Sequence, residues 1–265
     1  MPLSPDLASS SADTVSRASQ RGCFYQFSNA ERNTAAALEN YVLRGISARH
    51  NAIVIGCRES FLAVHLAKFF PTVFAVEENA AFLAEVIAKK PQIVGCQIEP
   101  DDFKISEPTD LVLVAHLMQS LGNWLETPEE RNHQRLAFLN HYCGSLAGGG
   151  AVVLLRNRPQ NNYRRLMEYV SVAPSDELQA LYGMIKQNFA LEHYLFPVEI
   201  NTQNDTEMVQ ALGYLVRSGD ADSGGNSQTD KTALLRTYTQ TLQNLDGNYY
   251  FNYEGELVVL RNNAG

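Results

Sequence analysis

The hydrophobic pattern is clearest in one central stretch of the chain, where two short apolar runs flank an amphipathic segment. Residues 52–55 (Ala-Ile-Val-Ile) and 73–76 (Val-Phe-Ala-Val) are continuous apolar runs of the kind that forms buried strands. Between them, apolar residues recur at helical spacing from Leu62 to Phe69, and Pro71 is placed to end that helix. The pattern predicts a strand, a turn, a helix and a second strand, which together make a βαβ unit.

Three further apolar runs continue this alternation as far as residue 155. They predict strands at residues 93–98, 111–115 and 151–155. Because the connections are short and helices are predicted between most of the strands, we expect an α/β protein with a doubly wound, mostly parallel sheet. Ligands of such sheets bind outside the carboxyl ends of the strands, so the residues that follow each run are the candidates for a site.

Capping residues indicate where two of the helices begin. Asn79 is a favourable N-cap for the helix after the second strand. Thr127 and Glu130 form a capping box with Pro128 at the first helical position. The glycines at residues 148–150 are expected to stop the helix that starts there.

The pattern changes after residue 155, and the remaining elements are less regular. Helices are expected at residues 161–170, 176–187 and 205–216, with another capped by Asp230. Strands are expected at residues 194–200, 249–251 and 257–260, the last two joined by a turn at residues 254–255. A helix at residues 30–46 precedes the sheet.

The composition is that of a globular protein. The chain has 265 residues, of which 45% are hydrophobic, with a formal net charge of -8 and a pI near 5.3. Its longest uncharged stretch, residues 111–125, is shorter than the roughly 20 apolar residues of a membrane span, and residues 1–20 lack the apolar core of a signal peptide. We therefore expect a cytoplasmic protein without a membrane partner.

Charge and metal-ligating residues argue against two further kinds of partner. An acidic protein needs a local basic patch to bind nucleic acid, and the pairs Arg156/Arg158 and Arg164/Arg165 are interpreted as solvated surface. The four cysteines and six histidines show no spacing of a metal site or redox pair. We expect no nucleic acid and no metal, while a homodimer is compatible with the sequence.

The turn and the second strand of the βαβ unit carry the chemistry of an adenosine site. Gly56 follows the first strand, and the turn leads into a helix N-terminus, whose amide groups favour a carboxylate. Glu77 stands at the carboxyl end of the second strand, where an acid can accept hydrogen bonds from both ribose hydroxyls. The two positions together predict an adenosine-containing ligand.

On these residues the chain resembles the class I S-adenosylmethionine-dependent methyltransferases of the small-molecule type. The resemblance rests on Ile53-Val54-Ile55-Gly56, on Glu77 and on the fourth-strand run from Asp110 to His116. It covers residues 24–155 well and the remainder loosely. It implies a seven-stranded Rossmann-like methyltransferase sheet, S-adenosylmethionine as the cofactor, a flexible tail at residues 1–22 and a single domain at residues 23–265 with a helical insertion or lid at residues 201–245.

The resemblance also implies which residues contact the cofactor. These are Gly56, Cys57, Glu77, Glu78, Glu99, Asp101, Ala115 and Tyr25. Glu77 is expected to hold the ribose, and Glu99 or Asp101 to lie near the adenine. The alternative for an acid after the second strand is a solvated side chain, for which Glu78 is the natural candidate. The alternative for Glu99 or Asp101 is a loop acid that caps a turn, and the alternative for Tyr25 is simple packing.

His116 is the expected catalytic residue. A neutral imidazole in the crevice after the fourth strand could accept a proton from a substrate amine or hydroxyl. The alternative is a histidine bonded to the backbone at the wall of the site. Substrate contacts are expected from Gln119, Trp124 and Tyr163, with Tyr194 and His193 as further residues that could line the same side.

The turn departs from the family in one respect. The family loop usually reads Gly-x-Gly-x-Gly, whereas this chain has Gly56-Cys57-Arg58-Glu59-Ser60 and keeps only the first glycine. Bulk and charge thus replace residues that allow a close approach of the backbone to the ligand.

The favoured function is an enzyme that transfers a methyl group from S-adenosylmethionine to a nitrogen or oxygen of a small molecule. Three alternatives stay open. The same cofactor could donate its aminocarboxypropyl group and release methylthioadenosine. Glu77 would also suit the ribose of a nicotinamide-dependent oxidoreductase. The chain could also be a non-catalytic protein that binds a partner.

Overall fold

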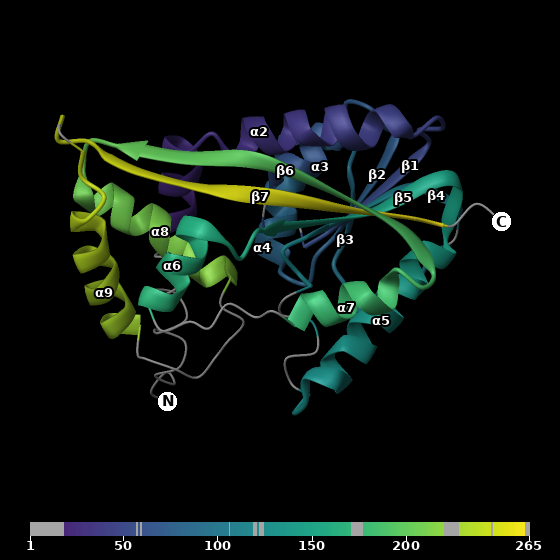
Figure 1. The fold of residues 1–265 in the computed structure, drawn as a ribbon. Coiled ribbons are helices and arrows are strands. Elements are labelled where there is room, and N and C mark those ends of the chain that lie inside the picture. The colour runs from purple at the N-terminus through teal and green to yellow at the C-terminus, as the bar shows by residue number, and fades with distance from the viewer. Residues whose placement is uncertain are drawn as a thin grey trace, which may run out of the picture. The chain divides into compact units, whose positions relative to one another are not determined.

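Seven strands form one sheet in the computed structural model, which describes residues 19–56, 58, 60–105, 107–118, 121, 125–170, 177–219, 228–244 and 246–262. The strands are β1 (Asn51–Ile55), β2 (Thr72–Val76), β3 (Val94–Cys96), β4 (Thr109–Ala115), β5 (Leu146–Asn157), β6 (Phe189–Thr202) and β7 (Tyr249–Asn262). Their order is β3-β2-β1-β4-β5-β7-β6 (Figure 1). β1 to β5 pair in parallel, and β7 runs antiparallel to β5. The expected α/β fold with a mostly parallel, seven-stranded sheet is confirmed.

Helices connect most of the strands, as the sequence predicts. They are α2 (Ala30–Ala37), α3 (Ser60–Leu66), α4 (Ala80–Lys89), α5 (Pro128–Gly144), α6 (Asn161–Tyr169), α7 (Glu177–Ile185), α8 (Asp205–Gly219) and α9 (Gln228–Gln240). Short helical turns lie at Leu38–Val42, Leu43–Gly45 and Pro100–Asp102, and residues 19–27 are also helical. Both predicted caps are confirmed: the Asn79 side chain accepts from the Ala81 N–H, and the capping box of Thr127 and Glu130 is complete.

The chain divides into two compact units. The first, here the sheet unit, comprises Arg32–Arg158, Ser175–Phe196 and Gly255–Gly265. The second, here the helical unit, comprises Met1–Glu31, Pro159–Pro174 and Pro197–Glu254. β6 and β7, each 14 residues long, contribute to both units. The predicted tail, domain and insertion boundaries stay predictions.

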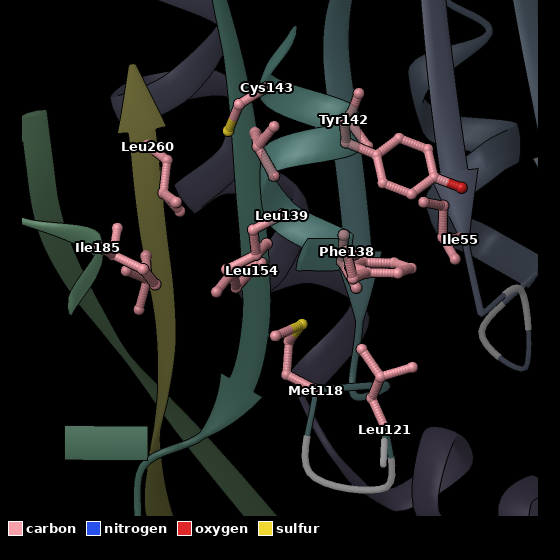
Figure 2. Close-up of a cluster of buried hydrophobic side chains, with 14 of the residues drawn as sticks. Ile55, Met118, Leu121, Phe138, Leu139, Tyr142, Cys143, Leu154, Ile185 and Leu260 are labelled. Carbon is pink, nitrogen blue, oxygen red and sulfur yellow. The ribbon is translucent and has the colours of Figure 1, made fainter. Parts of the chain in front are cut away.

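The core of the sheet unit lies between the sheet and the helices α5 and α7 (Figure 2). Because side chains alternate along a strand, every second residue of a strand faces these helices. The residues that do so include Val112, Val114, Val152, Leu154, Val258 and Leu260. From α5, Phe138, Leu139 and Tyr142 pack against them. Ala52 and Val54 of β1 are equally buried but belong to the alternate positions, which face the other side.

The glycines at residues 148–150 do not stop α5, so that prediction is wrong. The helix ends at Gly144, and the three glycines lie inside β5. A Cβ on Gly150 would lie 3.0 Å from the carbonyl oxygens of Thr109 and Asp110. Glycine is needed at this position because the neighbouring strand passes close to it, and not because a helix ends there.

The predicted turn at residues 254–255 is also wrong, since β7 is one continuous strand. A Cβ on Gly255 would collide with the ring of Phe196 on β6. The glycine therefore makes room for an aromatic ring within a strand. Asp230 does not cap α9 either, because that helix already begins at Gln228.

Candidate functional site

The carboxyl ends of β1, β2 and β4 meet at one edge of the sheet unit. Ile55 pairs in register with both Val76 and Val114. Gly56, the next residue, donates from its backbone N–H to the Val76 oxygen at 3.1 Å. Its φ is 77°, and a Cβ on it would lie 2.8 Å from the carbonyl oxygen of Ala115. Glycine is thus required here by its backbone angle and by β4, independently of any ligand.

Glu77 lies at the same edge and is only 5% exposed. Its backbone N–H donates to the Cys96 oxygen at 3.2 Å, which ties the end of β2 to the end of β3. Its carboxyl oxygen Oε1 accepts from the backbone N–H of Asn79 at 3.1 Å, beside the start of α4. Glu77 is therefore a buried and oriented acid one residue beyond a strand end, which is the chemistry that a ribose diol needs.

The other predicted acids occupy different surroundings. Glu78 is exposed. Glu99 is also exposed, and its carbonyl oxygen accepts from the Asp102 N–H at 3.0 Å in the short turn Pro100–Asp102. Asp101 belongs to that turn, but its side chain is outside the part that the structure describes. The roles of these three acids toward an adenine or ribose stay predictions.

His116 follows β4 with an unusual backbone. Its φ is 53°, which is uncommon for a residue other than glycine. Its backbone N–H donates to the carbonyl oxygen of Leu155 on β5 at 2.9 Å. Ala115, just before it, is buried. Backbone conformations of this kind gather at functional sites, so His116 stays the candidate catalytic residue.

Five predicted site residues lie outside the described part of the sheet unit. Cys57, Gln119 and Trp124 fall outside the described residues. Tyr25 and Tyr163 belong to the helical unit. There the Tyr25 hydroxyl lies 3.4 Å from that of Tyr214, and the buried Tyr163 ring packs on Tyr253 with their centroids 5.8 Å apart. Their roles toward a cofactor or substrate stay predictions.

A buried polar cluster was missed in the sequence. Arg156, interpreted there as solvated surface, is 6% exposed, and its Nε lies 2.6 Å from Oε2 of Glu256. The Nδ1 of His193 lies 2.8 Å from the other oxygen of Glu256. The guanidinium also lies over the ring of Tyr182, with 5.0 Å between its carbon and the ring centroid. No local sequence pattern connects Arg156 with Glu256, which are 100 residues apart. The register of β5 and β7 brings them together.

The described residues offer neither a metal site nor a membrane span. No group of three or more histidine, cysteine, aspartate or glutamate side chains in the described ranges could hold a metal ion. None of the helices in that part of the chain has the length and apolarity that crossing a membrane would take.

Comparison with known proteins supports the fold. No family model and no curated protein matches the sequence. A candidate methyltransferase from Bacillus halodurans is 18% identical with a TM-score of 0.54, over 86% of this chain and 97% of its own. A candidate type II methyltransferase from Anaeromyxobacter dehalogenans is 14% identical with a TM-score of 0.52, over 85% and 95%. The YcgJ protein of Bacillus subtilis is 9% identical with a TM-score of 0.55, over 87% and 99%.

These likenesses define the class of fold. The strand order with an antiparallel β7 is that of the S-adenosylmethionine-dependent methyltransferases. The two candidate methyltransferases match 86% and 85% of this chain, which agrees with the fold that the strand-end residues led us to expect.

Proposed function

We propose that this protein is an S-adenosylmethionine-dependent methyltransferase that acts on a nitrogen or oxygen atom of a small molecule. The observation that carries the proposal is that a methyltransferase fold gathers Gly56 and Glu77 at one strand-end edge. These residues fit an adenosyl cofactor, since Glu77 offers an acid for the ribose hydroxyls and Gly56 keeps the strand end free of a side chain.

The chemistry of methyl transfer defines what the cofactor supplies and what the protein has to do. S-adenosylmethionine supplies a methyl group that is already electrophilic. The protein has to align the acceptor, exclude water and receive a proton when the acceptor carries one. A proton acceptor is therefore expected near the carboxyl edge, where His116 follows β4. We also propose that the protein works in the cytoplasm, without a nucleic acid or membrane partner.

The products of a reaction with S-adenosylmethionine test this proposal. The purified full-length protein is incubated with the cofactor and a panel of small amines, phenols and carboxylic acids, and the products are separated by mass spectrometry. S-adenosylhomocysteine with a methylated acceptor is the expected pair. Methylthioadenosine would favour transfer of the aminocarboxypropyl group instead, and binding of NAD alone would contradict both.

A pair of matched variants ties the activity to the proposed site. Glu77→Gln removes the charge at the carboxyl edge, and Glu107→Gln makes the same change at an exposed residue before β4. We expect Glu77→Gln to slow product formation at low cofactor concentration and Glu107→Gln to leave it unchanged. Equal rates in the two variants would contradict the assignment of Glu77.

A further inference from the structure

Three neighbouring strands share a pattern on the face covered by α5 and α7. On each, apolar residues at alternate positions are followed by a polar residue toward the carboxyl edge. The rows are Val152, Leu154 and Arg156 on β5; Leu260, Val258 and Glu256 on β7; and Phe189, Leu191 and His193 on β6. We call Arg156, Glu256 and His193 the polar band. The band runs across three strands that are adjacent in the sheet, β5, β7 and β6.

The hydrogen bonds within the polar band define the state of one imidazole. Glu256 accepts through Oε2 from Arg156 and through Oε1 from Nδ1 of His193. A carboxylate can only accept, so the proton of the neutral imidazole lies on Nδ1. Nε2 of His193 then carries a lone pair that is ready to accept a proton.

The imidazole of His193 is more exposed than the carboxylate of Glu256 that holds it. The side chain of His193 is 36% exposed, whereas that of Glu256 is 6% exposed. The imidazole can therefore be reached from outside, while the acid behind it cannot. Arg156 balances the charge of Glu256, so these three residues carry no net charge when the imidazole is neutral. Such a site suits a neutral group that bears a proton better than it suits a carboxylate.

Tyr182 gives a second, independent indication of a ligand. Its side chain is 3% exposed, and its hydroxyl has no hydrogen-bond partner among the described residues. Its ring packs edge-on against His193, with the centroids 5.4 Å apart and the planes at 84°. Burial raises the pKa of this hydroxyl, so it stays a donor at neutral pH. A buried donor without an acceptor is costly and unusual, and an oxygen or nitrogen of a bound acceptor would satisfy it.

We propose that His193, in place of His116, receives the proton of the methyl acceptor, that Glu256 and Arg156 position its imidazole, and that the acceptor is a hydroxyl or amine compound. This inference rests on the proposed function. An electron pair of the acceptor oxygen or nitrogen would form the bond to the methyl carbon, and the carbon–sulfur bond would break with its electrons left on sulfur. The proton of the acceptor O–H or N–H group would move to Nε2 of His193.

The first test needs neither cofactor nor acceptor. Nitrogen-15 spectra of the imidazoles in the full-length protein report which ring nitrogen carries the proton. We expect His193 to be protonated on Nδ1 at neutral pH, and we expect Glu256→Ala, which removes the acceptor, to abolish this preference. A His193 imidazole protonated on Nε2 in the unmodified protein would overturn the proposal, because it could not accept a proton there.

The second test measures methyl transfer to a phenol, an alkyl amine and a carboxylic acid. His193→Gln should lower the rate of transfer to the phenol or amine roughly 100-fold or more, the usual range for loss of a general base. It should also remove the acidic limb of the pH–rate profile while leaving the affinity for S-adenosylmethionine unchanged. His133→Gln, at an exposed position on α5, is the matched control and should behave as the unmodified protein does.

The outcomes separate the two proposals. If the protein binds S-adenosylmethionine but His193→Gln keeps both the rate and the pH profile, the inference is wrong and the methyltransferase function stands. Transfer to the carboxylic acid alone, or to none of the three probes while the cofactor binds, would also overturn the inference. If the protein does not bind the cofactor, the proposed function fails and the inference fails with it. Since His193 is partly exposed, the variant is expected to fold.

Discussion

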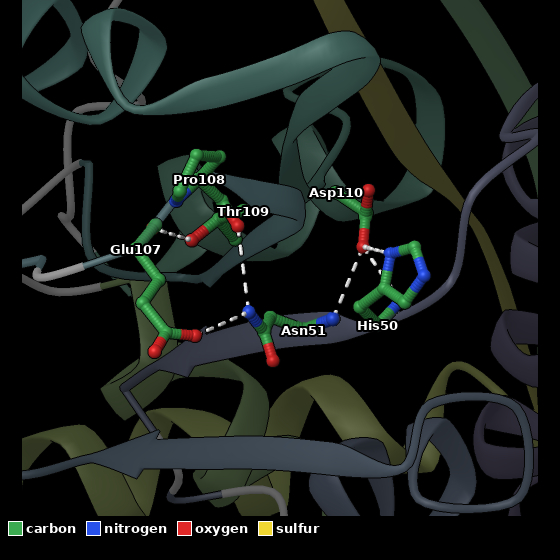
Figure 3. A network of polar contacts seen from close by, with 6 residues as sticks. All are labelled: His50, Asn51, Glu107, Pro108, Thr109 and Asp110. Carbon is green, nitrogen blue, oxygen red and sulfur yellow. Dashed lines mark hydrogen bonds and ion pairs between the residues drawn. The ribbon is translucent and has the colours of Figure 1, made fainter.

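Asp110 and Glu77 are both buried acids at strand termini of one sheet, but they lie at opposite edges. Asp110, near the start of β4, accepts from the backbone N–H groups of His50 at 2.6 Å and Asn51 at 3.0 Å (Figure 3). Glu77, beyond the end of β2, accepts from the backbone of Asn79 at 3.1 Å. At the amino edge an acid holds the backbone that begins a neighbouring strand. At the carboxyl edge of a parallel sheet, an acid lies where ligands bind.

The amino edge is a network that joins neighbouring segments. The same oxygen of Asp110 lies 3.6 Å from Nδ1 of His50, and the Asn51 amide lies 3.4 Å from Glu107 and from the Pro108 oxygen (Figure 3). These contacts connect the start of β1 to the segment before β4. The comparison predicts that removing the acid at the amino edge affects stability, and that removing the acid at the carboxyl edge affects binding.

The largest effect on stability is expected from Asp110→Ala. The substitution leaves two partly buried backbone N–H groups at the start of β1 without their acceptor, which should lower the free energy of unfolding by about 2–4 kcal/mol. Chemical denaturation measures the change, with Asp246→Asn at an exposed position as the control. An Asp110→Ala protein as stable as the unmodified one would show that the amino edge does not depend on this acid.

A smaller loss is expected from Gly56→Ala. The new Cβ would meet the Ala115 oxygen at 2.8 Å in a backbone with a φ of 77°. Such strain should cost about 1–3 kcal/mol of unfolding free energy. Gly183→Ala in α7, where no atom lies within 4 Å of an added Cβ, should be neutral or stabilising. Equal effects of the two substitutions would contradict the reason given for Gly56.

The smallest effect on stability is expected from Tyr182→Phe. Removing a buried hydroxyl that has no partner among the described residues should change the unfolding free energy by less than about 0.5 kcal/mol, or raise it. The same variant should raise the KM for a hydroxyl or amine acceptor, because the donor to the acceptor is lost. A clear loss of stability with an unchanged KM would assign Tyr182 to the fold alone.

The sequence predicts the βαβ unit and its edge well because local signals carry them. Continuous apolar runs mark β1 and β2, and Gly56 and Glu77 follow directly after them. The glycines of β5 and β7 mislead because their cause is not local. Glycine is required at position 150 because the backbone of β4 lies close to it. It is required at position 255 because the ring of Phe196 lies against it.

The polar band could not be predicted for a related physical reason. His193 and Glu256 are 63 residues apart, and they meet only because β6 and β7 are neighbours in the sheet. In the sequence, Arg156 stands two residues before Arg158, and nothing in the pattern distinguishes these two arginines from solvated surface residues. Its burial depends on Glu256, which no local pattern connects to it.

The central claim is that the carboxyl edge binds an adenosyl cofactor through Glu77. Isothermal titration with S-adenosylhomocysteine tests it directly on the unmodified protein, on Glu77→Gln and on Glu107→Gln. Loss of hydrogen bonds to a charged acid, each about 1.5–3 kcal/mol, should weaken binding to Glu77→Gln roughly 10- to 100-fold. Glu107→Gln should bind as the unmodified protein does. No binding to the unmodified protein, or equal affinities in all three, would contradict the account.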